Sequence, residues 1–154
     1  MIKDSGNRRQ FDSGAVRDMQ EGKGRCDLMP LDVVGQMMNT NGSCDNVIVA
    51  IALFQEKPDV KYLYIALDAF AQLRGWDKPT MLLEVAMHFE EGCAKYGEDN
   101  WRKGIPVKCY IDSGVRHYLK LLRGDEDEPH DRAFCWNMMC GIWTHDHLEK
   151  GGEG

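Results

Sequence analysis

The two longest amphipathic patterns in the chain are joined by the stretch Lys95-Tyr96-Gly97-Glu98-Asp99-Asn100-Trp101-Arg102-Lys103-Gly104. The pattern before it covers residues 79–96 and the pattern after it covers residues 107–123, and both have helical spacing. Connectors between helices are usually short and polar, so a Tyr and a Trp around Gly-Glu-Asp-Asn indicate an ordered loop. Either Gly97 ends the first helix and Trp101 fills the core, or the loop also belongs to a binding site.

The composition is that of one globular domain. The chain has 154 residues, of which 43% are hydrophobic and 29% charged, enough for a core of its own. A net charge of -6 does not suit a broad basic surface, so we expect no duplex nucleic acid as a partner. No apolar run has the length of a membrane span, and no signal segment opens the chain. The six cysteines include no Cys-x-x-Cys pair, so we expect buried, reduced thiols in a cytoplasmic protein without a membrane partner.

The periodicity predicts an all-α fold: a single compact domain, residues 1–154, of about five helices with an extended glycine-rich N-terminal arm at residues 1–29. Helical patterns cover residues 30–38, 47–54, 60–73, 79–96, 107–123 and 129–144. The second of these is apolar on all sides, and its alanines favour a buried helix over a strand. Ser43 or Asp45 is placed to cap it.

Three of the arm's cations, Arg17, Lys23 and Arg25, stand in its glycine-rich motifs. Its Gly-Lys-Gly-Arg sequence follows no predicted strand and lacks the spacing of a P-loop. Two interpretations are open. The arm is either flexible and exposed to solvent, or it is a cradle in which these cations bind phosphate.

The helix over residues 79–96 has two faces with different predictions. The stripe expected to face the core consists of Leu82, Ala86, Phe89, Cys93 and Tyr96. The opposite face, expected to be in solvent, carries Glu84, His88, Glu91 and Lys95. Glu84 and Glu91 lie two turns apart and could share a divalent cation, for which oxygen ligands favour Mg²⁺.

The last two helical patterns each contain polar residues with two interpretations. Asp112 and Arg116 lie one turn apart and form either a surface ion pair worth about 0.3–0.5 kcal/mol or a metal ligand and a phosphate clamp. The pattern over residues 129–144 is apolar nearly all round, so this helix is predicted to be central. On its one stripe of small or polar residues, His130 and Asn137 either belong to close helix packing or form the wall of a ligand pocket.

Several motifs together carry a resemblance to a known family. They are Gly14-Ala15-x-Arg17-Asp18, Gly22-Lys23-Gly24-Arg25-x-Asp27-Leu28-x-Pro30, Glu84-Val85-Ala86-x-His88-Phe89-Glu90-x-Gly92, Lys95-Tyr96-Gly97-x-x-Asn100-Trp101-x-x-Gly104, Asp112-x-x-x-Arg116-His117 and His130-x-x-Ala133-x-x-Trp136-Asn137. They resemble a phage and prophage family described as the N-terminal domain of dATP/dGTP diphosphohydrolases. The resemblance covers the first thirty-odd residues and residues 79–144, so we interpret residues 38–77 as an insertion and residues 79–147 as the core helices.

The resemblance implies cleavage of a purine deoxynucleoside triphosphate to the monophosphate and pyrophosphate, as in the all-α, Mg²⁺-dependent MazG-like enzymes. It also implies a homo-oligomer in the cytoplasm of a bacterial host. On this hypothesis the catalytic metal ligands are Glu84, Glu91 and Asp112. The phosphate-binding residues are Arg17, Lys23, Arg25 and Arg116. The residues around the base and sugar are Tyr96, Asn100, Trp101, His117, His130 and Asn137.

Two alternatives follow from departures from that pattern. The chain has no Glu-x-x-Glu, and its Glu-x-x-Asp in the matching half, Glu128 to Asp131, stands at a helix start. A non-catalytic nucleotide-binding protein that sequesters a host signalling nucleotide in anti-defence would need no such carboxylates. A weaker alternative is an HD-type phosphohydrolase built on His117, the His130-Asp131 pair and Asp146.

Overall fold

The computed structural model describes residues 6–38 and 45–149 and confirms the predicted all-α fold. The described residues form six α-helices: α1 (Leu31–Met37), α2 (Asn46–Glu56), α3 (Lys61–Arg74), α4 (Lys78–Tyr96), α5 (Val107–Arg123) and α6 (His130–Thr144). The shorter elements are strands β1 (Arg8–Gln10) and β2 (Val16–Asp18), 3-10 turns η1 (Cys26–Leu28) and η2 (Asn100–Lys103), and π-helical η3 (His145–Glu149). Within the described ranges, no helix is both long and apolar enough to cross a membrane.

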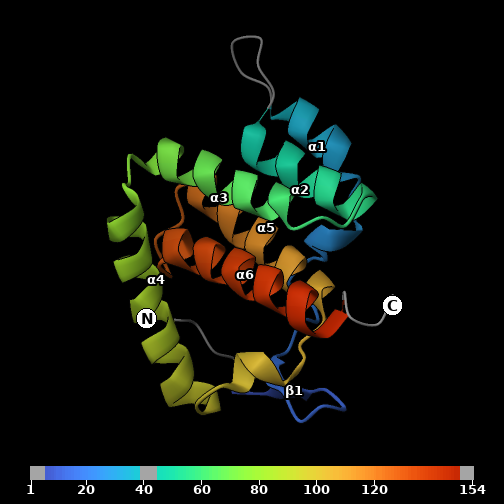
Figure 1. The fold of residues 1–154 in the computed structure, drawn as a ribbon, viewed down its shortest axis with the longest axis vertical. Helices are drawn as coiled ribbons and strands as arrows, with labels where there is room; N and C mark the ends of the chain where they lie inside the picture. Colours follow the sequence, from blue (N-terminus) through green and yellow to red (C-terminus); the bar gives the residue numbers. More distant parts are fainter. Residues whose placement is uncertain (1–5, 39–44, 150–154) are drawn as a thin grey trace.

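Helix α6 lies at the centre of the fold, as its apolar sequence predicts (Figure 1). Helix α5 packs against it closely at Gly114, where a Cβ atom would come within 2.6 Å of the Met138 side chain. In the same core, the ring of Phe70 on α3 lies 6.1 Å from that of Tyr118 and 4.6 Å from that of Phe134. Helices α3, α5 and α6 therefore share one hydrophobic core.

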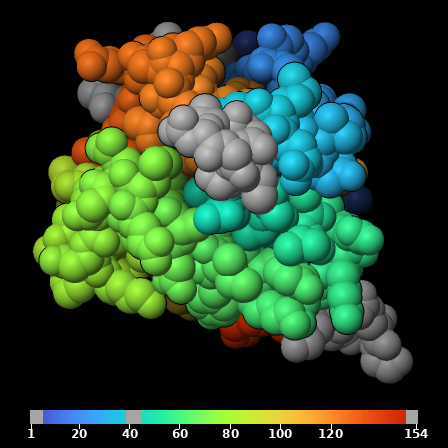
Figure 2. All heavy atoms as spheres, turned by 90° about the horizontal axis from the view of Figure 1, so that it is seen from above, coloured from blue at the N-terminus to red at the C-terminus, as the bar shows by residue number. Residues whose placement is uncertain are grey.

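Helices α1, α2 and α3 lie side by side and cover one end of the molecule (Figures 1 and 2). Asp45 caps α2 by accepting a hydrogen bond of 2.9 Å from the Ile48 N–H, and most residues of this helix are buried. The other predicted cap, Ser43, lies outside the described residues. Interpreting residues 38–77 as an insertion stays a prediction, although the described part, through Phe70, belongs to the main core.

Helix α4 turns a different face to the core from the one predicted. Its buried residues are Met81, Val85 and His88. Three members of the predicted core stripe are exposed instead: Leu82, Ala86 and Cys93. Periodicity could not separate the two faces because both carry apolar side chains, and contacts with α6 decide between them. His88, expected in solvent, lies with its ring 5.3 Å from that of Trp136.

The N-terminal arm folds back onto the helices. Strands β1 and β2 pair antiparallel with Arg9 opposite Arg17. The turn between them places Gly14 at a φ of 92°, in the left-handed region that favours glycine. Ala15, the next residue, is fully buried. The described residues 6–28 are therefore placed against the helices, with the hairpin at the β1 end of the molecule and η1 against α5 (Figure 1). Many of these residues remain exposed, as the interpretation as a solvent-exposed arm predicts.

The described cysteines are all free thiols, as predicted, but they are not all buried. Cys109, Cys135 and Cys140 are buried, and burial raises the pKa of Cys135 to about 12. Cys26 is half-buried and Cys93 is exposed. Cys44 lies outside the described residues.

Candidate functional site

A cleft of about 860 Å³ opens between the arm, the C-terminal half of α4, the connector after it, and α5, with two residues of α6 at its base. It brings together residues that lie far apart in the sequence. The predicted site residues that line it are Arg17, Lys23, Tyr96, Asn100, Trp101, Asp112, Arg116, His117 and Asn137. The predicted site residues outside its lining are Arg25, Glu84, Glu91 and His130.

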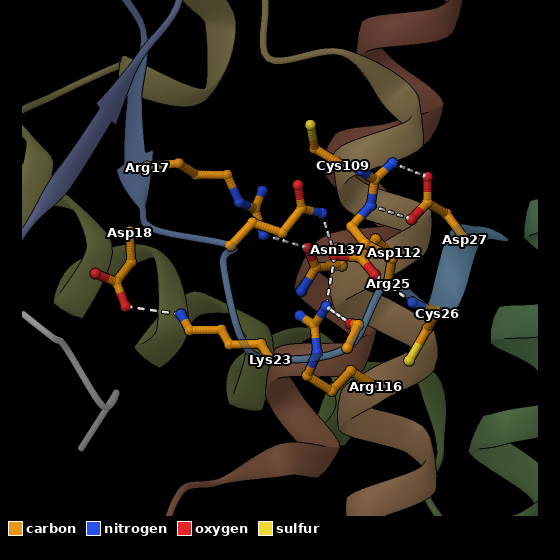
Figure 3. Close-up of polar contacts among 12 residues, drawn as sticks. Arg17, Asp18, Lys23, Arg25, Cys26, Asp27, Cys109, Asp112, Arg116 and Asn137 are labelled. Carbon is orange, nitrogen blue, oxygen red and sulfur yellow. Dashed lines mark hydrogen bonds and ion pairs between the residues drawn. The ribbon is translucent and has the colours of Figure 1, made fainter.

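Arg17 is the cation most completely built into this cleft. It extends from β2 toward α6, where Nη2 donates a hydrogen bond of 3.1 Å to Asn137 Oδ1 (Figure 3). Its guanidinium lies 5.1 Å from the Tyr110 ring and 6.0 Å from the Trp136 ring. Within the described residues Nη1 is buried and has no hydrogen-bond partner, and no carboxylate forms an ion pair with this side chain. A guanidinium nitrogen that is shielded from water and has no hydrogen-bond partner or counter-charge is costly, so this position favours an anionic ligand.

The cleft also gathers other buried polar atoms that lack partners. Of the seven such side-chain atoms among the described residues, five belong to residues that line the cleft: Arg9, Arg17, His88, Arg116 and Trp136. Nearly all buried polar groups in native proteins have partners. The concentration of unsatisfied donors here therefore indicates a surface whose hydrogen bonds are completed by a ligand.

Asp112 and Arg116 clamp the arm onto α5. The Asp112 carboxylate is 1% exposed, and it accepts hydrogen bonds from the Gln20 side chain and, at 2.6 Å, from the Cys26 N–H. Arg116 Nη2 lies 2.6 Å from Asp112 and donates a 2.5 Å hydrogen bond to the Gly24 carbonyl (Figure 3). Burial raises the pKa of Asp112, but the bonds from Gln20 and Arg116 outweigh it and hold that pKa below its ordinary value. Asp112 and Arg116 therefore form a buried ion pair that holds the arm against α5, and not a surface ion pair.

The other two predicted phosphate-binding cations of the arm, Lys23 and Arg25, have acidic partners on the arm itself. Lys23 Nζ lies 2.7 Å from Asp18 at the rim of the cleft, with 41% of its side chain exposed. Arg25 donates two hydrogen bonds, of 2.8 and 2.7 Å, to Asp27 (Figure 3). Pairing with Asp27 raises the pKa of Arg25. Lys23 is free to rotate toward a ligand, whereas the guanidinium of Arg25 is already occupied outside the cleft.

The connector after α4 fixes the arm and two helices at once. Gly97 ends α4 at a φ of 89°, and its N–H donates to the Cys93 carbonyl. The Trp101 ring lies edge-on to Phe89 of α4 at 5.5 Å and to Trp143 of α6 at 5.0 Å. The loop is therefore ordered, with Gly97 as the cap and Trp101 in the aromatic core.

Asn100 holds the hairpin in place. Its Oδ1 accepts from the Val16 N–H at 2.9 Å, and its Nδ2 donates to the Val16 carbonyl at 2.8 Å. It is only 7% exposed. Although Asn100 lines the cleft, the structure gives it a docking role rather than a free amide for a ligand.

Replacing Asn100 by Asp is expected to loosen the hairpin and cost about 1–2 kcal/mol, because a carboxylate cannot donate to the Val16 carbonyl. The rate of tryptic cleavage after Arg9 and Arg17 measures this loosening, and we expect it to be higher in the variant. The exposed Asn7→Asp variant is the control. Equal cleavage rates in the two variants would contradict the docking role.

Glu84 and Glu91 face α6, where Arg132 lies between them. Arg132 Nε is 3.6 Å from Glu84, and Arg132 Nη1 is 3.9 Å from Glu91. Among the described residues, neither carboxylate belongs to a group of three ligand atoms within 4.8 Å of one another, and neither does Asp112. The predicted metal site of Glu84, Glu91 and Asp112 therefore stays a prediction without geometric support, because each carboxylate has a cationic partner.

His88 introduces a pH dependence. It is 6% exposed, and burial lowers its pKa to about 4 from an ordinary value of 6.5. Between these two values the unfolded chain binds a proton that the folded protein does not, so stability is fully present above pH 6.5 and falls as the pH drops toward 4. Unfolding free energies across this window should decrease by about 1–3 kcal/mol.

The variant His88→Leu is expected to reduce that slope. His117, whose pKa burial also lowers well below 6.5, would leave a residual slope. The exposed His147 supplies the control, since His147→Gln should keep the wild-type slope. An unchanged slope in the His88 variant, measured by denaturant titration at each pH, would show that His88 is not the source.

Sequence reasoning missed several residues of the cleft. Gln20 and Arg9 gave no signal because they belong to a polar, glycine-rich arm. Trp136 was part of the family motif His130-x-x-Ala133-x-x-Trp136-Asn137 but was not predicted as a site residue, although a buried Trp N–H needs a partner. Its Nε1 is buried and unpartnered in the part of the chain that the structure describes.

The fold and the cleft define a class: an all-α protein with a cleft suited to an anionic small molecule. A family model described as dATP/dGTP diphosphohydrolase, N-terminal, matches residues 55–152, and the chain belongs to this family. The match confirms the resemblance, covers α3 to α6 and begins near the end of α2. No curated protein and no solved structure matches the chain.

Proposed function

We propose that the cleft binds a purine deoxynucleoside triphosphate and that the protein hydrolyses it to the monophosphate and pyrophosphate. The family description names dATP/dGTP diphosphohydrolase activity. The observation that carries the proposal is the set of buried, unsatisfied donors in the cleft, above all Arg17 Nη1. Phosphate oxygens are strong acceptors for guanidinium donors.

In this reaction water attacks the α-phosphorus, the bond from that phosphorus to the bridging oxygen breaks, and pyrophosphate leaves. Arg17 and Arg116 would hold the phosphates and stabilise the charge that develops on their oxygens. Lys23, at the rim, would leave Asp18 to reach the terminal phosphate. Tyr96, Trp101 and Trp136 offer aromatic surface for the base.

The residues predicted to hold Mg²⁺ do not fit that role in their present arrangement. Both oxygens of Asp112 accept hydrogen bonds from the protein. Glu84 and Glu91 are paired with Arg132.

The second candidate function is a non-catalytic nucleotide-binding protein that sequesters a signalling nucleotide. The engagement of Asp112, Glu84 and Glu91 by protein partners favours it. Such a protein would need the cations and aromatic residues of the cleft but no group that activates water.

Incubation with each deoxynucleoside triphosphate, followed by chromatography of the products and a pyrophosphate assay, separates the two functions. The enzyme is expected to release pyrophosphate from dATP or dGTP. Tight binding with quantitative recovery of intact nucleotide after denaturation would instead support sequestration. Absence of both turnover and any nucleotide-induced shift in Tm would reject both functions.

A further inference from the structure

A second group of metal-binding side chains lies beside the cleft, apart from the three predicted carboxylates. His117 is on α5, His130 is the first residue of α6, and Glu128 is in the turn before it. One ligand atom from each of these residues lies within 4.8 Å of the other two. The Nδ1 atoms of the two histidines face each other at 2.9 Å.

We propose that His117, Glu128 and His130 bind a divalent transition-metal ion of the class that includes Zn²⁺, Co²⁺ and Mn²⁺. Two nitrogens that each lie about 2.0–2.1 Å from one ion, at about 90–110° to each other, are separated by about 2.8–3.4 Å. The observed 2.9 Å lies at the short end of that range. Imidazole ligands favour transition metals over Mg²⁺, which prefers oxygen.

Asp127 orients the His130 ring and selects the tautomer that can bind a metal ion through Nδ1. Its Oδ1 lies 2.8 Å from His130 Nε2, and His130 is 1% exposed. A carboxylate accepts the Nε2 proton and leaves Nδ1 as the lone-pair nitrogen, the arrangement common around metal-bound histidines. Without an ion, His117 Nδ1–H must then be the donor between the rings. Binding an ion requires that this proton move to Nε2 of His117 through solvent, and that both rings turn so that their Nδ1 lone pairs converge on the ion instead of pointing at each other.

The site is reachable from the cleft because His117 and Glu128 line it. Three protein ligands leave a coordination position for water or substrate, which is typical of catalytic rather than structural sites. The inference does not need the proposed function, since metal binding requires only these side chains. If both hold, the ion would lie at the edge of the nucleotide cleft.

A neighbouring group, Asp125, Asp127 and His130, also has ligand atoms within 4.8 Å. It is the weaker candidate because Arg123 already donates two hydrogen bonds, of 2.8 and 2.5 Å, to Asp125. This acidic group also has only one imidazole ligand, that of His130. The two groups share His130, so variants of the other residues distinguish them.

The test is titration of the chelator-treated protein with Co²⁺, followed by visible absorption, with Zn²⁺ competition and metal analysis for stoichiometry. One ion per chain is expected, with absorption bands of a nitrogen-ligated site. His117→Gln and Glu128→Gln should each weaken binding by at least about tenfold, since even loss of an outer partner such as Asp127 costs about 10–100-fold. The exposed neighbour Glu126 gives the control, Glu126→Gln, which should bind like the wild type.

The readout is metal binding, so its failure is independent of whether the cleft hydrolyses nucleotides. No bound Co²⁺ or Zn²⁺ in the wild type would overturn the site whatever the variants do. Wild-type affinity in both His117→Gln and Glu128→Gln, with loss in Asp125→Asn, would assign the ion to the acidic group instead. If His117→Gln does not fold, Glu128→Gln and the wild-type titration still decide.

Discussion

Replacing Asp112 by Asn is expected to lower the free energy of unfolding by about 3–5 kcal/mol, because it leaves the Arg116 guanidinium without its counter-charge. The side chains of this pair are 2% and 12% exposed, so solvent cannot replace the lost partner. The new amide also cannot satisfy all of the donors that now converge on Asp112, from Gln20, Cys26 and Arg116. Denaturant unfolding at neutral pH measures the effect.

The same variant should release the arm. Trypsin is expected to cleave after Arg17, Lys23 and Arg25 faster than in the wild type, before the helices are attacked. The matched control is Asp68→Asn, since Asp68 pairs with Lys78 at 3.3 Å with both side chains more than half exposed. Such a pair is worth at most about 1 kcal/mol. If Asp112→Asn kept wild-type stability and arm protection while losing a bound ion, Asp112 would be a metal ligand after all.

The helices were the most predictable part of this fold. The helix predicted over residues 107–123 has those bounds in the structure, because proline and glycine border a strongly amphipathic sequence. The orientation of α4 was not predictable from periodicity. Its exposed face carries Leu82, Leu83 and Met87, which are 50%, 71% and 49% exposed, so hydrophobicity alone favoured the wrong side. Packing of His88 against Trp136 selects the other face.

Several residues of the site could be predicted from the sequence, but their positions relative to one another could not. The sequence suggested Arg17, Arg116 and Asn137 from three separate segments, and the structure places all three on one cleft. What brings them together is the docking of the arm through Asn100 and Asp112. The two residues that form each of these contacts lie more than eighty positions apart in the sequence, and the arm contributes backbone groups. Neither composition nor motif spacing could therefore predict these contacts.

Replacing Arg17 by Met is expected to weaken nucleotide binding by about 10–100-fold while leaving the protein as stable as the wild type or more so. The loss of affinity follows because a charge-assisted hydrogen bond contributes about 1.5–3 kcal/mol. Stability is not lost with it, because removing the buried, unpartnered Nη1 offsets the loss of the hydrogen bond that Nη2 donates to Asn137. Methionine keeps much of the apolar stem beside Tyr110 and Trp136 but removes the unsatisfied charge.

Weaker nucleotide binding without loss of stability separates a binding arginine from a structural one. Calorimetric titration with dGTP and thermal unfolding without nucleotide would be run on the same preparations. Arg25→Met is the control, because Arg25 belongs to the same arm, is satisfied by Asp27 and does not line the cleft. A structural arginine would show lower stability and unchanged affinity in Arg17→Met, and that result would remove the central cation from the proposed site. Arg116→Ala should also weaken binding, both through the lost contact with the nucleotide and through release of the arm that Arg116 holds through Asp112 and Gly24.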